Sequence, residues 1–163
     1  DPAVLTVQQA HNESPLPGYL VADVEADQKG SLGPAADRLW DAYFHYVAGL
    51  AERLDCRFLA AWVRCEVTLR NALAAARAKR LGLEAADYLV AADLALEGEE
   101  WAGVVTEWAS SATPLAGQQV LLRARWAWLA DNDAWFSFRD DELAVYAARL
   151  MLLHQWERIT NKQ

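Results

Sequence analysis

The sequence is poor in several features that define common classes of protein. Its 163 residues include two cysteines, one methionine and five prolines, and no uncharged apolar run reaches the length of about 18 residues that a membrane-spanning helix needs. Basic residues are outnumbered, with 15 Lys and Arg against 23 Asp and Glu, for a formal net charge of −8. Because nucleic acids and anionic lipids attract basic surfaces, this balance argues against both as partners. The lack of a long apolar run argues against direct membrane insertion.

The two cysteines are not expected to form a disulfide. Cys56 and Cys65 are nine positions apart, so on one helix their Cα atoms would lie about 13 Å apart on opposite faces. A disulfide requires a Cα separation of about 4.4–6.8 Å. The sequence therefore predicts two buried thiols in a reducing compartment.

What the chain has in abundance is apolar volume arranged with helical spacing. Hydrophobic residues make up 54% of the sequence and include eight tryptophans. From Ala35 onward apolar residues recur every three or four positions, and no alternating strand pattern persists. We predict an all-α fold, an antiparallel bundle of five to six helices over residues 35–163.

Residues 1–34 differ in composition from the rest. They hold four of the five prolines and three of the eight glycines, which predicts an irregular lead-in with room for one short helix around Tyr19–Ala26. The first residues, Asp1-Pro2-Ala3, suggest a fragment of a longer protein.

Two long helices are predicted in the first half of the bundle. The first, over residues 35–54, carries the stripe Leu39, Tyr43, Val47, Leu50 and Leu54, widened by Trp40, Phe44 and Ala51. Asp55 is a candidate N-cap for the second helix, and Gly82 a left-handed stop after Leu81. One face of the second helix carries Phe58, Trp62, Cys65, Leu69, Leu73 and Ala76, whereas Arg57, Arg64 and Thr68 are expected to point largely elsewhere.

The second half of the bundle is divided by turn and cap signals. A short helix or turn is expected around Glu84–Val90, followed by an acidic link (Glu97, Glu99 and Glu100) and the stripe Trp101, Val104, Val105 and Trp108. Thr113-Pro114 is a helix start. Residues 131–139 break the pattern, and Ser137 can cap the last helix. That helix carries the apolar stripe Leu143, Tyr146, Ala147, Leu150, Leu153 and Trp156.

No motif in the sequence provides catalytic chemistry, a cofactor site or a metal site. The three histidines fall in separate elements without ligand spacing. Asp131, Asp133 and Glu142 match three positions of a calcium loop, but Phe136 occupies the place where the turn requires glycine. Glu66 and Arg70, at i and i+4, are expected to pair on their helix. We therefore predict a non-enzymatic protein without cofactors or metals.

The candidate functional residues are contacts to a partner. Basic side chains gather near one helix end at Arg77, Lys79 and Arg80, where they either complement the helix dipole or contact an acidic partner. Asn71, in mid-helix, either bonds a neighbouring helix or is solvated. Trp126 and Trp128 face about 200° apart on a helix, so either that helix is central or one tryptophan contacts a partner.

Two segments resemble known families. The stretch from Trp62 to Gly82, with Asn71, Arg77-Ala78-Lys79 and Gly82, resembles the helix signature of the C-type subunit (d-type in the eukaryotic enzyme) of rotary V/A-type ATPases. It departs from that signature in having Thr68 where an acidic residue is usual, with Glu66 slightly upstream.

The second segment lies nearer the C-terminus. The order Arg125-Trp126-Ala127-Trp128, Phe138, Tyr146 and Gln155-Trp156-Glu157-Arg158 is similar to a bacterial family of unknown function associated with V-type ATPase operons. Together the two resemblances cover roughly residues 35–159.

The resemblance implies a non-catalytic V-type ATPase accessory protein. Such a scaffold couples the central stalk to the membrane ring, so its partners would be other proteins of the ATPase and its location cytoplasmic, peripheral to the membrane. The alternative is a stand-alone adaptor or regulatory domain that binds a peptide or small molecule through a tryptophan-rich surface. A cleft lined by Trp126, Trp128 and Trp135 would favour the adaptor, and a flat patch of exposed aromatics the scaffold.

Overall fold

The structure, a computed structural model, describes residues 11, 35–96, 101–133, 136 and 139–160. Within them every regular element is helical, which confirms the predicted fold class. The elements are α3 (Ala35–Arg53), α4 (Arg57–Leu81), the 3₁₀ turns η1 (Ala85–Tyr88) and η2 (Ala92–Leu94), α5 (Ala102–Ala109), α6 (Pro114–Asp131) and α7 (Asp140–Thr160). The short helix expected at Tyr19–Ala26, the acidic link at Glu97–Glu100 and Ser137 lie outside the described residues.

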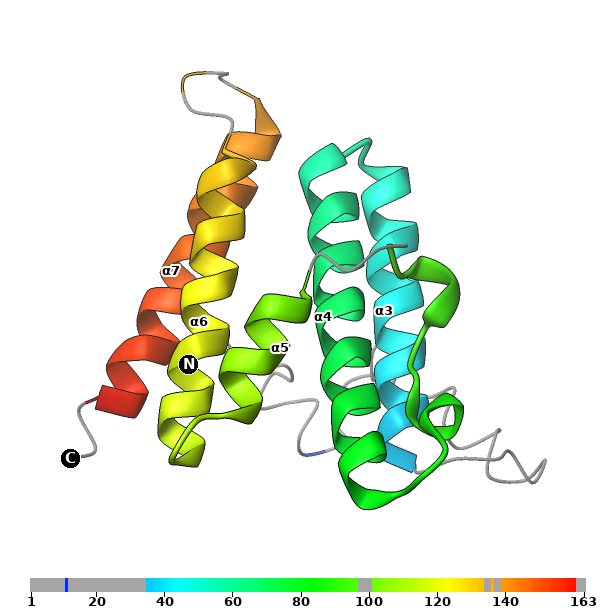
Figure 1. Cartoon of the computed structure of the whole chain (residues 1–163). Coiled ribbons are helices and arrows are strands. Elements are labelled where there is room, and N and C mark those ends of the chain that lie inside the picture. The colour runs from blue at the N-terminus through cyan, green and yellow to red at the C-terminus, as the bar shows by residue number, and fades with distance from the viewer. Residues whose placement is uncertain (1–10, 12–34, 97–100, 134–135, 137–138, 161–163) are drawn as a thin grey trace.

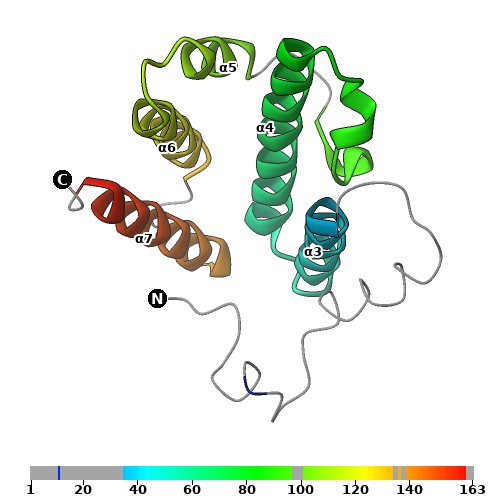
Figure 2. The same ribbon diagram turned by 90° about the horizontal axis from the view of Figure 1, so that it is seen from below.

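The helices form two antiparallel hairpins joined through a shared centre (Figure 1). One hairpin consists of α3 and α4, the other of α6 and α7, and α5 lies between them. Seen from below, α4 stands in the middle, with α3 and residues 85–96 on one side and α5, α6 and α7 on the other (Figure 2). Among the described residues, no helix combines the length and the apolarity needed to cross a bilayer.

Helix α4 contributes to all three hydrophobic clusters. Val63 and Val67 pack with Phe44 and with residues 90 and 91 on the α3 side. The other two clusters lie toward α5, α6 and α7, and their α4 members are Phe58 in one and Cys65, Leu69 and Leu73 in the other. A helix buried on two sides has no single apolar stripe, so the predicted one-sided burial of α4 was incomplete.

Thr68 is the clearest correction on α4. It was expected to point away from the core but is only 9% exposed. Its hydroxyl donates to the Arg64 carbonyl at 2.7 Å and accepts the Leu96 N–H at 2.8 Å. Because the hydroxyl both donates and accepts a hydrogen bond, its burial leaves no polar group without a partner.

The ends of α4 show one correct and one incorrect prediction. Gly82 follows Leu81 with φ 69°, the left-handed conformation that favours glycine, and its N–H bonds the Lys79 carbonyl. At the other end the N-cap is Cys56, without a side-chain cap, and not Asp55. The Phe58 N–H is bound instead by the carboxylate of Asp141, which arrives from α7.

Helix α6 begins as predicted. Its N-cap is Thr113, whose hydroxyl accepts the Ala116 N–H at 3.1 Å, and Pro114 is the first helical residue. Helix α5 packs closely against it, because a Cβ added at Gly117 would meet the Trp108 ring at 3.1 Å. The predicted stripe of α5 is confirmed as a core contact, with Trp101 buried beside Val104, Val105 and Trp108.

The apolar stripe predicted on the last helix is exposed. The residues of α7 that are buried against α4 and α6 are Val145, Ala148 and Leu152. Leu143, Tyr146, Ala147, Leu150, Leu153 and Trp156 face solvent. Both faces of α7 are apolar, so periodicity by itself could not tell which one is buried.

Candidate functional site

A charged cleft of about 510 Å³ lies along α4, between α3, α6 and residues 81–88. Its charged walls are two ion pairs between helices. Arg125 of α6 binds Glu66 with two bonds, of 2.6 and 2.9 Å, and Arg70 binds Asp37 of α3 at 2.9 Å. The expected Glu66–Arg70 pair within α4 is therefore wrong, because each side chain reaches a partner on another helix. Partly buried ion pairs between helices, the Arg125–Glu66 pair being bidentate, fix the helices relative to one another.

Two of the arginines that line this cleft also lie over aromatic rings. Arg70 is 4.9 Å from the Trp40 ring centre, and Arg77 is 5.0 Å from that of Trp108. Arg77 thus joins the end of α4 to α5 while remaining exposed. Lys79 and Arg80 are exposed beside it, in the last turn of α4, where positive charge is favourable for the helix dipole.

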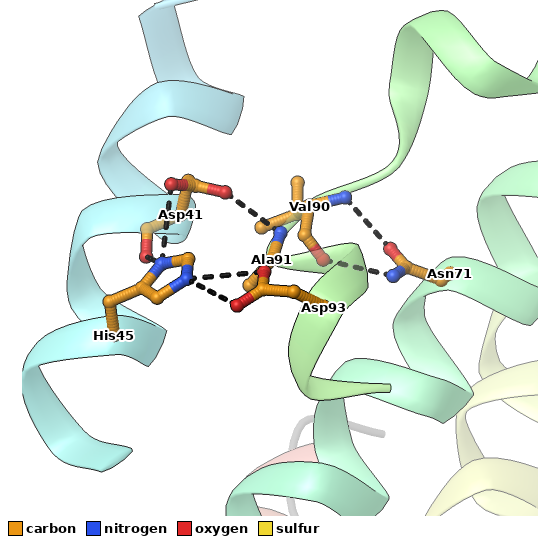
Figure 3. A network of polar contacts seen from close by, with 6 residues as sticks. All are labelled: Asp41, His45, Asn71, Val90, Ala91 and Asp93. Atoms are coloured by element: carbon orange, nitrogen blue, oxygen red, sulfur yellow. Dashed lines mark hydrogen bonds and ion pairs between the residues drawn. The ribbon is translucent and has the colours of Figure 1, made fainter. Parts of the chain in front are cut away.

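Asn71 docks residues 85–96 onto α4 (Figure 3). Its amide nitrogen donates to the Val90 carbonyl and its amide oxygen accepts the Val90 N–H, both at 2.9 Å. Asn71 is 8% exposed, so these contacts satisfy a buried polar group in both directions. Its partner is a loop, and neither a neighbouring helix nor solvent. Asp41 of α3 adds a third bond by accepting the Ala91 N–H at 2.8 Å.

His45 completes this network on the α3 side (Figure 3). Its Nδ1 lies 2.9 Å from the Asp41 carbonyl and its Nε2 3.1 Å from an Asp93 carboxylate oxygen. Both ring nitrogens face oxygen acceptors, an arrangement that suits the doubly protonated imidazolium. Partial burial is the largest single influence and lowers the pKa of His45. The bond with the Asp41 backbone and the Asp93 and Asp41 carboxylates outweigh it, so the pKa is raised above its ordinary value.

Cys56 sits where α7 meets the start of α4. Its thiol donates to the Asp141 carboxylate at 3.4 Å, beside the Phe58 N–H that donates to the same oxygen at 3.1 Å. Burial raises the pKa of the Cys56 thiol and the Asp141 carboxylate raises it further, although a backbone bond with Leu59 opposes them. Neither cysteine forms a disulfide, as predicted. Cys65 is buried as expected, but Cys56 is only half-buried.

The two candidate tryptophans of α6 lie on opposite sides of the helix. Trp128 packs into the core, with ring centres 5.4 Å from Trp62 and 6.2 Å from Phe58. Trp126 is 41% exposed and lies at the molecular surface. Trp135 is outside the described residues, so the proposed three-tryptophan cleft is not formed by the two that can be placed.

Trp126 is part of an exposed, largely apolar surface, which we call the outer α6/α7 face. Its members are large side chains that are 38–69% exposed: Trp126, Leu143, Tyr146, Leu150, Leu153 and Trp156. Next to Trp126 and Trp156 the surface is hollowed into an open groove of about 430 Å³, completed by Leu122, Arg123, Ala127, Leu152 and Leu153. Helices α6 and α7 lie at the edge of the molecule in both views (Figures 1 and 2).

Two of the three residues that match a calcium loop bind other partners. Asp133 pairs with Arg149 at 2.6 Å, and Glu142 accepts the Phe136 N–H at 3.1 Å. Across the described part of the chain, no three His, Cys, Asp or Glu side chains gather closely enough to hold a metal ion.

Several contacts in these sites were not predicted from the sequence. Asp41, His45, Asp93 and Asp141 make contacts over 48 to 85 positions, apart from the local Asp41–His45 contact. Asn71, by contrast, was a candidate residue, and asparagine is unfavourable inside a helix. No local pattern indicates the others.

Comparison of the chain with protein-family models, with curated proteins and with solved structures finds no significant match. The resemblance to the C-type ATPase protein and to the family associated with V-type ATPase operons therefore stands on the quoted motifs alone.

Proposed function

We propose that this chain is a non-catalytic protein-binding scaffold whose contact surface is the outer α6/α7 face. The observation that carries the proposal is the exposure of six large apolar side chains, from two adjacent helices, on one side of the molecule. Contiguous apolar patches of this kind are uncommon on monomers and mark interaction sites. Moving a large apolar side chain from full exposure to full burial contributes about 1.5–3 kcal/mol. These six are 38–69% exposed, so a partner that covers several of them gains part of that amount from each.

The rest of the molecule suits a scaffold that transmits force. Helix α4 takes part in all three hydrophobic clusters, and the Arg125–Glu66 and Arg70–Asp37 pairs connect it to α6 and α3. Close-packed interiors resist deformation, so a load applied to one hairpin reaches the other.

The more specific proposal is an accessory role in a V-type ATPase, between the central stalk and the membrane ring. It rests on the resemblance of the stretch from Trp62 to Gly82 to the C-type protein of those enzymes. Within that stretch, Arg77, Lys79 and Arg80 are exposed at the end of α4, where an acidic partner could reach them. The stand-alone adaptor is favoured less, because Trp128 lies in the core and does not line the surface groove.

Co-purification from native membranes tests this function. The tagged chain is expected to recover V-type ATPase subunits, identified by mass spectrometry. Leu150→Lys, on the outer face, is expected to reduce their yield at least about tenfold, because it places a charge in the apolar contact. Met151→Lys is the matched control, since Met151 is 56% exposed on the same helix but outside this face.

Recovery of no ATPase subunit would overturn the ATPase proposal. Equal yields with Leu150→Lys and the wild type would show that the outer face is not the contact surface for that complex.

A further inference from the structure

The exposed apolar residues of α7 have a spacing that is the same when it is read from either end of the helix. Leu143, Tyr146, Leu150 and Leu153 are spaced 3, 4 and 3 residues apart, the seam spacing of a helix that packs against another helix. Arg139, which lies just before α7 and 4.0 Å from the Asp141 carboxylate, precedes this seam by four positions, and Glu157 follows it by four. The series therefore begins with a positive charge, continues through four apolar residues and ends with a negative charge.

We propose that the outer α6/α7 face is occupied by the same face of a second copy of this chain, with the two α7 helices antiparallel. The inference rests on the proposed function, because it names the occupant of that face; the other ATPase proteins would then bind the dimer that this contact forms. In this pairing Leu143 lies opposite Leu153 of the second copy, and Tyr146 opposite Leu150. A two-fold axis repeats each contact, as in an isologous dimer.

Charge complementarity fixes the direction of the helices. The antiparallel register places Arg139 of each copy opposite Glu157 of the other, so opposite charges close both ends of the apolar layers. A parallel arrangement would place Arg139 against Arg139 and Glu157 against Glu157. Like charges in contact are unfavourable, so the pattern selects the antiparallel pair.

The sides of the seam are compatible with the same register. On one side Asp140 lies opposite His154 of the second copy, with Ala147 opposite Ala147 near the axis, where a small residue allows close approach. On the other side the two Arg149 residues face each other. Each is neutralised by its own Asp133 at 2.6 Å, which limits their repulsion.

Sedimentation equilibrium of the purified 163-residue chain tests the pairing. Because the net charge of −8 makes two copies repel at long range, the measurement is made at physiological ionic strength. We expect a reversible monomer–dimer equilibrium. Leu150→Lys is expected to weaken dimerisation at least about tenfold, because the axis repeats the damage, while Met151→Lys leaves it unchanged.

A charge exchange tests the direction. Arg139→Glu creates two repulsive Glu–Glu contacts per dimer and is expected to weaken dimerisation about three- to tenfold. Adding Glu157→Arg restores opposite charges in the antiparallel register and is expected to recover most of the loss. Circular dichroism of each variant verifies that the helices are intact.

A chain that stays monomeric at every concentration would overturn the inference, as would a double variant no better than Arg139→Glu alone. The proposed function is tested independently of the dimer. A monomeric chain that still loses ATPase subunits on Leu150→Lys would keep the function and assign the face to a different protein. A dimer that recovers no ATPase subunit would keep the inference and reject the ATPase role.

Discussion

At the scale of single residues, His45 is held between carboxylates from two elements. Asp41 lies one turn earlier on α3, and Asp93 belongs to η2, so the imidazole ties residues 85–96 to α3. In the same contact, the hydrogen bond from His45 is the main cause that lowers the pKa of the Asp93 carboxyl. The contact is exposed to solvent and is therefore modest in energy.

Its pH dependence has a definite sign. The folded-state pKa of His45 is raised above its unfolded value of about 6.5, so the stabilisation is fully present below that value and is lost as the pH rises through the folded pKa. A double-mutant cycle of His45→Ala and Asp93→Asn, measured by urea unfolding, is expected to give favourable coupling near pH 5.5 and almost none near pH 8.5. Coupling that is equal at both pH values would contradict the charged contact.

At the scale of elements, the start of α4 depends on a residue from α7. The Asp141 carboxylate binds the Phe58 N–H, which the helix itself cannot satisfy, and it also accepts from the Cys56 thiol. Because this side-chain cap comes from another helix, the stability of α4 depends on the packing of α7 against it.

Replacing this cap should weaken the junction of the two helices. Asp141→Ala leaves a half-buried N–H without its acceptor and is expected to lower the free energy of unfolding by about 1–2 kcal/mol. Asp140→Ala is the control, because Asp140 is exposed in the same first turn and has the same interaction with the helix dipole. Thermal or urea unfolding of both variants measures the difference, and equal losses would show that Asp141 acts through the dipole alone.

At the scale of the whole molecule, α4 is the element through which the two hairpins are held together. Because it takes part in all three hydrophobic clusters, we expect the described bundle to unfold in one cooperative transition, with circular dichroism and tryptophan fluorescence reporting the same midpoint.

A matched pair of leucines on α4 tests this dependence. Leu69 is 0% exposed and Leu81 is 67% exposed, at the end of the helix. Leu69→Ala is expected to cost about 2–5 kcal/mol through lost burial and a cavity, whereas Leu81→Ala should change stability by about 0.5 kcal/mol or less. Two separate transitions in urea, or equal effects of the two substitutions, would contradict a central role for α4.

The sequence by itself determined the features that local chemistry controls. The spacing of apolar residues gave the helices, Gly82 the end of α4 because glycine accepts φ 69°, and Thr113-Pro114 the start of α6. The separation of the two cysteines along the chain also excluded a disulfide correctly. Each of these results depends on neighbours within a few positions.

Only the tertiary structure decided which apolar face of α7 is buried, which carboxylate caps α4 and which partners Glu66 and Arg70 take. Their contacts join residues 33 to 85 positions apart in the sequence. A local sequence pattern contains no information about contacts over such separations. A helix that is apolar all round can bury any side, and a charged side chain can reach any nearby opposite charge. The packing of α7 against α4 makes that choice, and it leaves the stripe from Leu143 to Leu153 on the surface.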